Sequence, residues 1–230
     1  GGRKTQTITS AGKTFTQPIT VDSYGGTVQL ADALNIGTTT LTVTNGTFDT
    51  KNYNVTASIF ASLNSNVRTI NLGSSTVTLS SGGNSFAIAP ETNATLNAGT
   101  STLSLTASQT GVNANGLTFY NVIFTTTIGG GTHTFTGSST YNNVTITAPA
   151  SAGLINLAFL SNNTINGTLT VSGLSAVQRI FLRSDTLGTT RTLTVNSLSA
   201  NDCDFRDITI AGTAAGTAPT RAGDCGGNTG

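Results

Sequence analysis

The sequence is poor in charge, in long apolar runs and in several residue types. It has no tryptophan, no methionine, one histidine and two cysteines, and charged residues make up 8% of its 230 positions. So little charge would suit a membrane protein, yet no stretch approaches the roughly 20 consecutive apolar residues of a transmembrane helix. The 10 Lys and Arg are scattered without a basic run, and nucleic-acid affinity rests on clustered positive charge. We therefore expect neither a membrane span nor a nucleic-acid partner.

Helical periodicity and the signature of disorder are also missing. No window places apolar residues at 3.6-residue spacing among good helix formers. Disordered chains are short of β-branched and aromatic residues, whereas here Val, Ile, Leu and 10 Phe recur at strand spacing. With Gly1 at the start and no initiator methionine, the sequence is expected to be a processed chain or a piece of a longer one. We expect an ordered, strand-rich chain.

What is present is a repeat. Two residues at alternate positions, a two-residue break and a second alternating apolar pair describe two short strands that meet at a bend. The motif occurs at Leu117–Phe124, Ser139–Ile146 and Cys203–Ile210. Its ring recurs from 119 to 141, 22 residues, and from 141 to 205, 64 residues or nearly three periods, as Phe119, Tyr141 and Phe205. A fixed period near 22 residues is typical of a solenoid.

A smaller unit, apolar–outward–apolar, extends the repeat along the chain. It occurs at Leu41–Val43, Val77–Leu79, Leu103–Leu105, Val122–Phe124, Val144–Ile146, Leu169–Val171, Leu193–Val195 and Ile208–Ile210. Strand, turn and strand at this period, without a crossover helix, predict an all-β fold: a right-handed parallel β-helix with a period of about 22 residues and coils about 4.8 Å apart. An antiparallel β-sandwich is the alternative, because it also places turns every 8–12 residues.

The β-helix predicts a ladder of inward side chains. Phe119, Tyr141 and Phe205 should occupy one bend, with the rings of Phe119 and Tyr141 in stacking reach. A second set of core positions comprises Val122, Val144, Leu169, Leu193 and Ile208, of which 122, 144, 169 and 193 should lie above one another.

Three regions follow from the pattern. Residues 1–35 are ragged and predict an N-terminal cap, residues 36–210 predict the coils, and residues 211–230 are a Gly- and Thr-rich turn segment. The last segment has little apolar content to cover Ile208 and Ile210, and an open coil edge invites strand addition. We expect the chain to continue there or to dock on a neighbouring subunit, and few charges favour a homo-oligomer, a trimer or a fibre.

Acidic residues cluster once, at Asp202 and Asp204, and Asp224 lies one period beyond Asp202. Adjacent coils should bring Asp224 close to Asp202, and paired carboxylates suit calcium binding or acid–base hydrolysis of a glycan. No diagnostic motif accompanies them, so a solvated charged edge is the plainer interpretation. We expect no catalytic centre, no metal and no cofactor.

The cysteines and the histidine leave simpler alternatives. Cys203 and Cys225 are also one period apart, so a disulfide that closes the last coil and two reduced thiols are equally compatible with the sequence. His133 has no nucleophile pattern beside it, and a surface strand position is its expected place.

The middle residue of most triplets is threonine. A flat threonine ladder would suit an ice-binding solenoid, but β-branched threonine also suits the solvent face of any strand. The middle residues are Thr42, Thr78, Ser104, Ile123, Thr145, Thr170, Thr194 and Thr209, so Ile123 interrupts the row. Ice binding is therefore a distant alternative here.

The bend motifs and the tail together resemble a known group of proteins. Residues 117–146 and 203–230, with their aromatic, Asn or Asp, Val or Ile pattern and the Asp-Cys-Gly-Gly-Asn tail, resemble β-helical stretches of tailed-bacteriophage virion proteins, especially tail fibres and tail tips. Bacterial β-helical surface adhesins and autotransporter passengers look similar.

The resemblance implies a non-enzymatic structural or receptor-binding role on a virion or cell surface. It also implies an assembly that is often trimeric, with neighbouring structural subunits or a cell-surface glycan as partner. A polysaccharide lyase or hydrolase on the same fold is the alternative.

Overall fold

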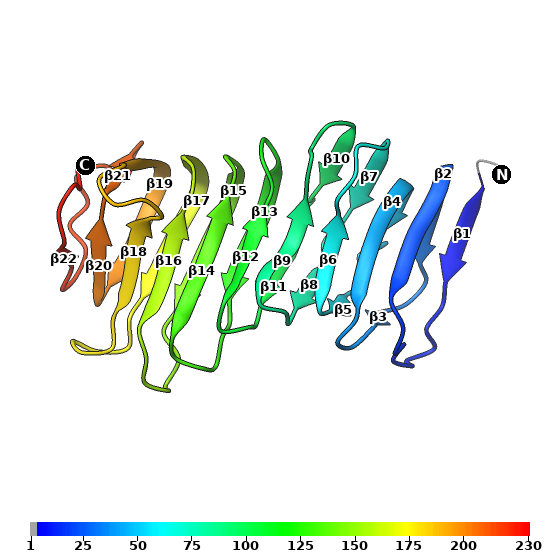
Figure 1. Ribbon diagram of the computed structural model, residues 1–230, viewed down its shortest axis with the longest axis horizontal. Coiled ribbons are helices and arrows are strands. Elements are labelled where there is room, and N and C mark those ends of the chain that lie inside the picture. The colour runs from blue at the N-terminus through cyan, green and yellow to red at the C-terminus, as the bar shows by residue number, and fades with distance from the viewer. Residues whose placement is uncertain (1–3) are drawn as a thin grey trace.

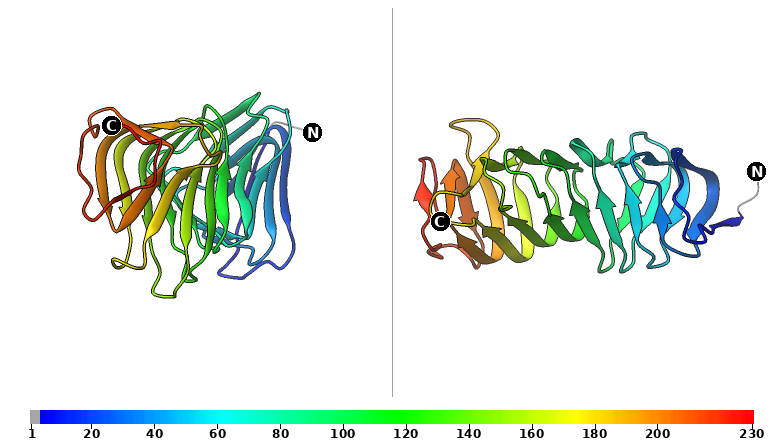
Figure 2. Two further views of the ribbon diagram at one scale, coloured as in Figure 1. Left: turned by 60° about the vertical axis from the view of Figure 1, so that its left-hand side comes forward. Right: turned by 90° about the horizontal axis from the view of Figure 1, so that it is seen from below.

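The computed structural model describes residues 4–230, and within this range all regular structure is β-strand. Parallel sheets wind into a β-solenoid of about 10 turns with a period near 23 residues (Figure 1). The coils follow one another along a single axis, with the two chain ends at opposite ends of the molecule (Figure 2). The predicted parallel β-helix is confirmed, and the antiparallel sandwich was the wrong alternative.

Two parallel sheets contain all the strands. The larger comprises, in spatial order, β1 (Thr5–Ile8), β2 (Ile19–Leu30), β4 (Thr40–Asp49), β6 (Ile59–Ser62), β9 (Gly83–Ile88), β12 (Thr110–Asn113), β14 (Gly131–Thr136), β16 (Ile155–Phe159), β18 (Ile180–Ser184), β20 (Cys203–Arg206) and β22 (Gly223–Asp224), with β7 (Arg68–Asn71) and β10 (Ala94–Asn97) branching from β4. The smaller comprises β3 (Leu34–Asn35), β5 (Val55–Ala57), β8 (Thr76–Leu79), β11 (Thr102–Leu105), β13 (Thr118–Phe124), β15 (Thr140–Thr147), β17 (Asn163–Ser172), β19 (Arg191–Asn201) and β21 (Ile208–Ala211).

Bends within the longer strands give each coil three faces. The first part of β4 pairs with β6 and its second part with β7. Gly46 stands at this bend with φ +76°, where a β-carbon would collide with the carbonyl of Ser23 in the preceding coil. Strands β13, β15, β17 and β19 bend in the same way, so that each pairs in two segments.

We number the three faces. Face 1 contains the first parts of β2 and β4 and then β6, β9, β12, β14, β16, β18, β20 and β22. Face 2 contains β1, the second parts of β2 and β4, β7, β10, the first parts of β13, β15, β17 and β19, and β21. Face 3 contains β3, β5, β8, β11 and the second parts of β13, β15, β17 and β19.

A chain of aromatic rings runs through the core. Phe119 and Tyr141 are buried and stack as expected, with ring centroids 5.3 Å apart and planes 17° from parallel. Neighbouring rings along the chain have centroids between 4.8 and 6.4 Å apart, a range typical of attractive aromatic pairs, in the order Phe48, Phe60, Phe86, Phe119, Tyr141, Phe135 and Phe159. Aliphatic side chains of all three faces fill the remaining interior.

Several assigned ladder positions differ from the prediction. Val122, Val144 and Leu169 do lie above one another, but the next residue in that column is Leu198. Leu193 instead pairs with Asn163 on face 2. The reason is that coils differ in length through their turns, so a constant period drifts out of register.

The third copy of the bend motif is also on different faces. Phe205 belongs to β20 on face 1, where it pairs with Leu182, so it is not equivalent to Phe119 and Tyr141. Ile208 pairs with Arg191 on face 2. Leu193, Phe205 and Ile208 are nevertheless all buried.

The two end segments take part in the coils. Within residues 5–35, expected to form a cap, β1 pairs with β2, and β2 with β4. In residues 211–230, β22 pairs with β20, and Thr229 forms a bridge with Thr209. This last turn leaves Ile208 and Ile210 only 1% and 7% exposed. A hollow of about 330 Å³ remains beside them.

Face 2 is interrupted once. Strand β10 forms a ladder with β7 only, and the first part of β13 forms one with β15 only. A hollow of about 240 Å³ lies between them, lined in part by Leu96, Gly99, Phe119 and Tyr120. Face 2 therefore consists of two blocks of strands.

Candidate functional site

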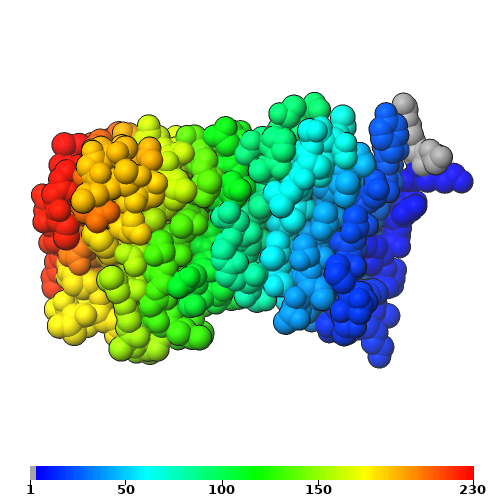
Figure 3. Space-filling model, in the orientation of Figure 1, coloured from blue at the N-terminus to red at the C-terminus, as the bar shows by residue number. Residues whose placement is uncertain are grey.

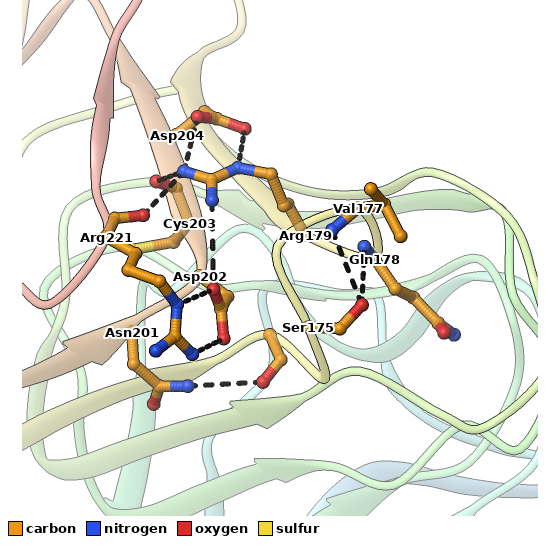
Figure 4. A network of polar contacts seen from close by, with 10 residues as sticks. Ser175, Val177, Gln178, Arg179, Asn201, Asp202, Cys203, Asp204 and Arg221 are labelled. Carbon is orange, nitrogen blue, oxygen red and sulfur yellow. Dashed lines mark hydrogen bonds and ion pairs between the residues drawn. The ribbon is translucent and has the colours of Figure 1, made fainter.

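The acidic residues singled out in the sequence lie in a charged cluster near the C-terminal end of face 1 (Figure 4). Asp204 is on β20, and Asp202 occupies the turn before it with φ +48°. Arg179 precedes β18 in the preceding coil, and Arg221 precedes β22 in the following one. Three successive coils thus supply the cluster.

Arg179 is bound to Asp204 through two parallel hydrogen bonds. Its Nε donates to Oδ2 and its Nη2 to Oδ1, both at 2.8 Å. Nη2 also donates to the carbonyl oxygens of Cys203 and Arg221, each at 2.7 Å. The hydrogen bonds with Asp204 raise the pKa of the Arg179 guanidinium. The fork geometry ties one coil to the next two.

Asp202 is held by the second arginine. Its side chain is 1% exposed, and Oδ1 accepts a hydrogen bond from Arg221 Nε at 2.6 Å. Oδ2 pairs with Arg221 Nη2, and Arg179 Nη1 lies 3.9 Å from Oδ1. The hydrogen bonds from Arg221 hold the pKa of the Asp202 carboxyl below its usual range. Asp202 is therefore an ionised residue that anchors a turn.

Asp224 does not join the other carboxylates. It pairs with Phe205 across the ladder, and its Oδ1 accepts hydrogen bonds from Gly226 N at 2.8 Å and Asn228 Nδ2 at 2.6 Å. The Gly226 bond lowers the pKa of its carboxyl. The expected pair of Asp224 with Asp202 is wrong, because it is Gly223 that pairs with Asp204 and Asp224 thus falls beside the following residue.

The cluster is chemically quiet in this arrangement. A general acid in glycan hydrolysis needs a raised pKa, whereas the pKa values of Asp202 and Asp224 are lowered and Asp204 is engaged by Arg179. Among residues 4–230 no group of three His, Cys, Asp or Glu is placed to hold a metal ion. The nearby Asp185 pairs with Arg191 at 2.8 Å.

The cysteines are free and differ in environment. Cys203 is buried, and burial raises the pKa of its thiol to about 11. Cys225 is exposed, and its backbone N–H donates to the Phe205 carbonyl. Because Asp204 pairs with Gly223, Cys203 and Cys225 are offset by three residues along adjacent strands, or about 10 Å, beyond disulfide reach. Of the two alternatives, the reduced thiols are the ones observed.

His133 is not on the surface. It is fully buried, and its ring centroid lies 4.8 Å from that of Phe124. Burial lowers the pKa of the imidazole to about 4. The neighbouring threonines are partly exposed, so the strand alternation is as expected but its inward and outward sides were exchanged in the prediction.

The threonines noted in the sequence are divided among the faces. Thr78, Ser104, Ile123, Thr145 and Thr170 do form one column on face 3. Thr42 lies on face 1, and Thr194 and Thr209 lie on face 2. The apolar triplets had drawn attention away from a second pattern, threonine, inward residue and asparagine, that recurs on face 2.

Arg179 and Arg221 were the other residues that the sequence analysis missed as partners of the acidic cluster. Arg221 follows Asp202 by 19 residues and Arg179 precedes Asp204 by 25, so both lie roughly one coil away. Opposite charges one period apart were the signal that could have found them.

Comparisons with known proteins add no relative. No family model, no curated protein and no solved structure matches the chain. Within residues 4–230 no helix could span a membrane. What is established for this chain is thus its fold, a parallel β-solenoid of about 10 turns.

Proposed function

We propose that the chain is a non-enzymatic structural and adhesive module, a β-helical rod of a virion or cell-surface fibre. The observation that carries the proposal is the uninterrupted hydrophobic core, which runs through the coils from Val21 to Ala214. Successive coils cover the surface as adjacent bands (Figure 3). Such a solenoid holds its shape along its length and presents long, regular faces.

The surface chemistry supports a neutral ligand. Faces 2 and 3 are built from strands in which threonine, serine and asparagine dominate the outward positions. A surface with so little charge has no electrostatic means to attract nucleic acid, but hydroxyl and amide groups can bind the hydroxyls of a cell-surface glycan. The glycan is the receptor class that we propose.

Exposed aliphatic residues on successive turns support an assembly. Ile128, Leu154 and Val177 are 63%, 60% and 94% exposed. They lie in the turns that lead into β14, β16 and β18, which extend along the lower edge in Figure 1. A row of exposed apolar groups is typical of an interaction surface. We propose that this edge contacts further copies, in a trimer or fibre, or a neighbouring structural subunit.

Sedimentation over a wide concentration range, combined with electron microscopy, tests the assembly. We expect trimers or fibres, and expect Val177→Asp together with Leu154→Asp to dissociate them. Leu63→Asp with Val67→Asp is the matched control, because these residues are similarly exposed but lie on another turn. A monomer at all concentrations, with no particle longer than one chain, would contradict the assembly.

Incubation with bacterial capsular polysaccharide separates the adhesive role from the alternative lyase or hydrolase. An adhesive module retains the polysaccharide and releases neither reducing ends nor unsaturated products between pH 4 and pH 9. Release that disappears in Asp204→Asn would establish the enzymatic alternative and overturn the proposal. The ion pairs of Asp202 and Asp204 give that alternative less support.

A further inference from the structure

Face 2 presents a column of threonines, one from each of nine successive coils. Direct strand pairing aligns the first five, and after the gap beside β10 it aligns the remaining four. The side chains are all exposed or half-buried. The column consists of Thr5, Thr27, Thr47, Thr69 and Thr95, then Thr118, Thr140, Thr164 and Thr194.

A second column lies two residues further along each strand and is mainly composed of amides. Asn97 Nδ2 donates to Asn71 Oδ1 at 2.8 Å, and Gln29 Nε2 donates to Thr7 Oγ1 at 3.3 Å, so neighbouring coils hold these side chains in place. The column consists of Thr7, Gln29, Asp49, Asn71, Asn97, Tyr120, Asn142, Asn166 and Asn196. Asp49 is the one charged residue in the two columns.

The two columns form a regular, stiff array. Adjacent coils are about 4.8 Å apart, and alternate residues on a strand are about 6.6 Å apart. Threonine is β-branched and has few χ1 rotamers, so its hydroxyl and methyl groups repeat at fixed positions. Buried Phe48, Ile70, Tyr141 and Ile165 lie on the inner side of the same strands. The array is therefore anchored to the core.

The chemistry of the array limits what it can bind. With one carboxylate among 18 side chains it attracts no polyanion or polycation, since long-range recognition of either needs clustered charge. With one ring, Tyr120, it is no stacking platform for a sugar chain. Hydroxyls, amides and methyls that repeat in two directions match a ligand that itself repeats in two directions and is held by hydrogen bonds.

We infer that face 2 binds ice. The threonine hydroxyls and asparagine amides take hydrogen-bonding positions of the water lattice, while the threonine methyls occupy the spaces between water molecules. A rigid array pays little conformational entropy on binding, and many weak contacts on one face act together, because each additional rung binds within an already docked surface. This activity goes beyond the adhesive role and uses a different surface from the edge of exposed aliphatic residues.

Thermal hysteresis and the shape of single ice crystals, measured with the full chain, test the inference. We expect the chain to depress freezing below melting and to facet the crystals. Thr69→Lys and Thr164→Lys place a long charged side chain in the array and should abolish most of the hysteresis.

Each variant has a matched control in its own coil. Thr78→Lys follows Thr69, and Thr170→Lys follows Thr164, but both controls lie on face 3 and all four threonines are half-buried. The controls should retain the wild-type hysteresis. Thr164→Val, which removes one hydroxyl at nearly constant volume, provides a second variant should the lysine variants fail to fold by circular dichroism.

The results divide cleanly. A wild-type chain without hysteresis and without effect on crystal shape overturns the inference, and equal losses on faces 2 and 3 overturn the assignment to face 2. Retention on insoluble neutral polysaccharide without any effect on ice also overturns it. That last result would leave the proposed adhesive role standing.

Discussion

Arg68 is a wholly buried charged side chain at the start of β7. Its guanidinium donates to Ser62 Oγ at 2.7 Å and to the carbonyl oxygens of Asn66 at 2.9 Å, Thr92 at 2.8 Å and Pro90. Burial lowers its pKa, but an arginine remains protonated. One residue thus satisfies the backbone of two turns in successive coils.

Replacing Arg68 should destabilise the fold strongly. Arg68→Leu leaves several buried carbonyl groups without donors, and we expect the free energy of unfolding to fall by about 3–5 kcal/mol in chemical denaturation. Arg183→Leu is the control, because Arg183 is partly exposed on face 1, and should cost less than about 1 kcal/mol. Equal losses in the two variants would contradict the role of Arg68.

His133 makes stability depend on pH. In the folded chain it stays neutral down to about pH 4, because burial lowers its pKa, whereas in the unfolded chain it binds a proton near pH 6.5. The unfolded state therefore binds more protons between these values, and stability falls as pH falls through this window.

The magnitude follows from the shift. We expect the free energy of unfolding to decrease by about 3 kcal/mol between pH 7 and pH 4, from roughly 1.4 kcal/mol per pKa unit. His133→Leu should flatten the profile in this window, since the Asp residues with lowered pKa titrate below it. A profile unchanged by the substitution would show that other groups cause the pH dependence.

At the level of strands, the repeat predicted the fold and the register of nearby coils. Phe119 and Tyr141 are one coil apart and were placed correctly. Over longer separations the period failed, because turns of different length accumulate: Leu198 rather than Leu193 follows Leu169, and Phe205 is on face 1. The side of each residue is thus readable from alternation, whereas distant pairing requires the length of every intervening turn.

The aromatic column gives a second test at this level. Phe119→Ala removes a ring in contact with Phe86 and Tyr141, and we expect a loss of about 3–5 kcal/mol in the free energy of unfolding. Tyr120→Ala on the same strand is the control, because Tyr120 is half-buried, and it should cost distinctly less. The reverse order would place Phe119 outside the core.

The charged cluster fastens the last coil to its neighbours. Arg221→Met leaves buried Asp202 with only the more distant Arg179, 3.9 Å away. Hydrogen exchange by mass spectrometry should then report faster exchange in residues 220–229, with unchanged protection around Leu169. Unchanged exchange at the C-terminal coil would mean that the β22 ladder alone holds it.

For the candidate site, the sequence predicted which residues cluster but not their state. Asp202 and Asp204 are neighbours in any fold, so their proximity was certain. Their pairing with Arg179 and Arg221 depends on two further coils whose lengths differ from the mean period. The absence of the Asp202 and Asp224 pair has the same origin, since a shift of a single residue decides whether two carboxylates meet.

On the scale of the whole molecule, the account rests on coils that stack in one direction. The threonine column supplies natural reporters, because it has one member per coil along the axis. From Thr69 to Thr164 there are four steps, through Thr95, Thr118 and Thr140, and from Thr27 there are six. At about 4.8 Å per coil these separations are about 19 and 29 Å.

Distances between nitroxide labels on cysteine pairs, measured by pulsed electron paramagnetic resonance in a background without Cys203 and Cys225, test this stacking most directly. The Thr69→Cys and Thr164→Cys pair should lie about 10 Å closer than the Thr27→Cys and Thr164→Cys pair, with narrow distributions in both, as two additional coils require. Equal distances, a shorter distance for the pair that spans more coils, or broad distributions would contradict a β-solenoid in which these threonines occupy one column.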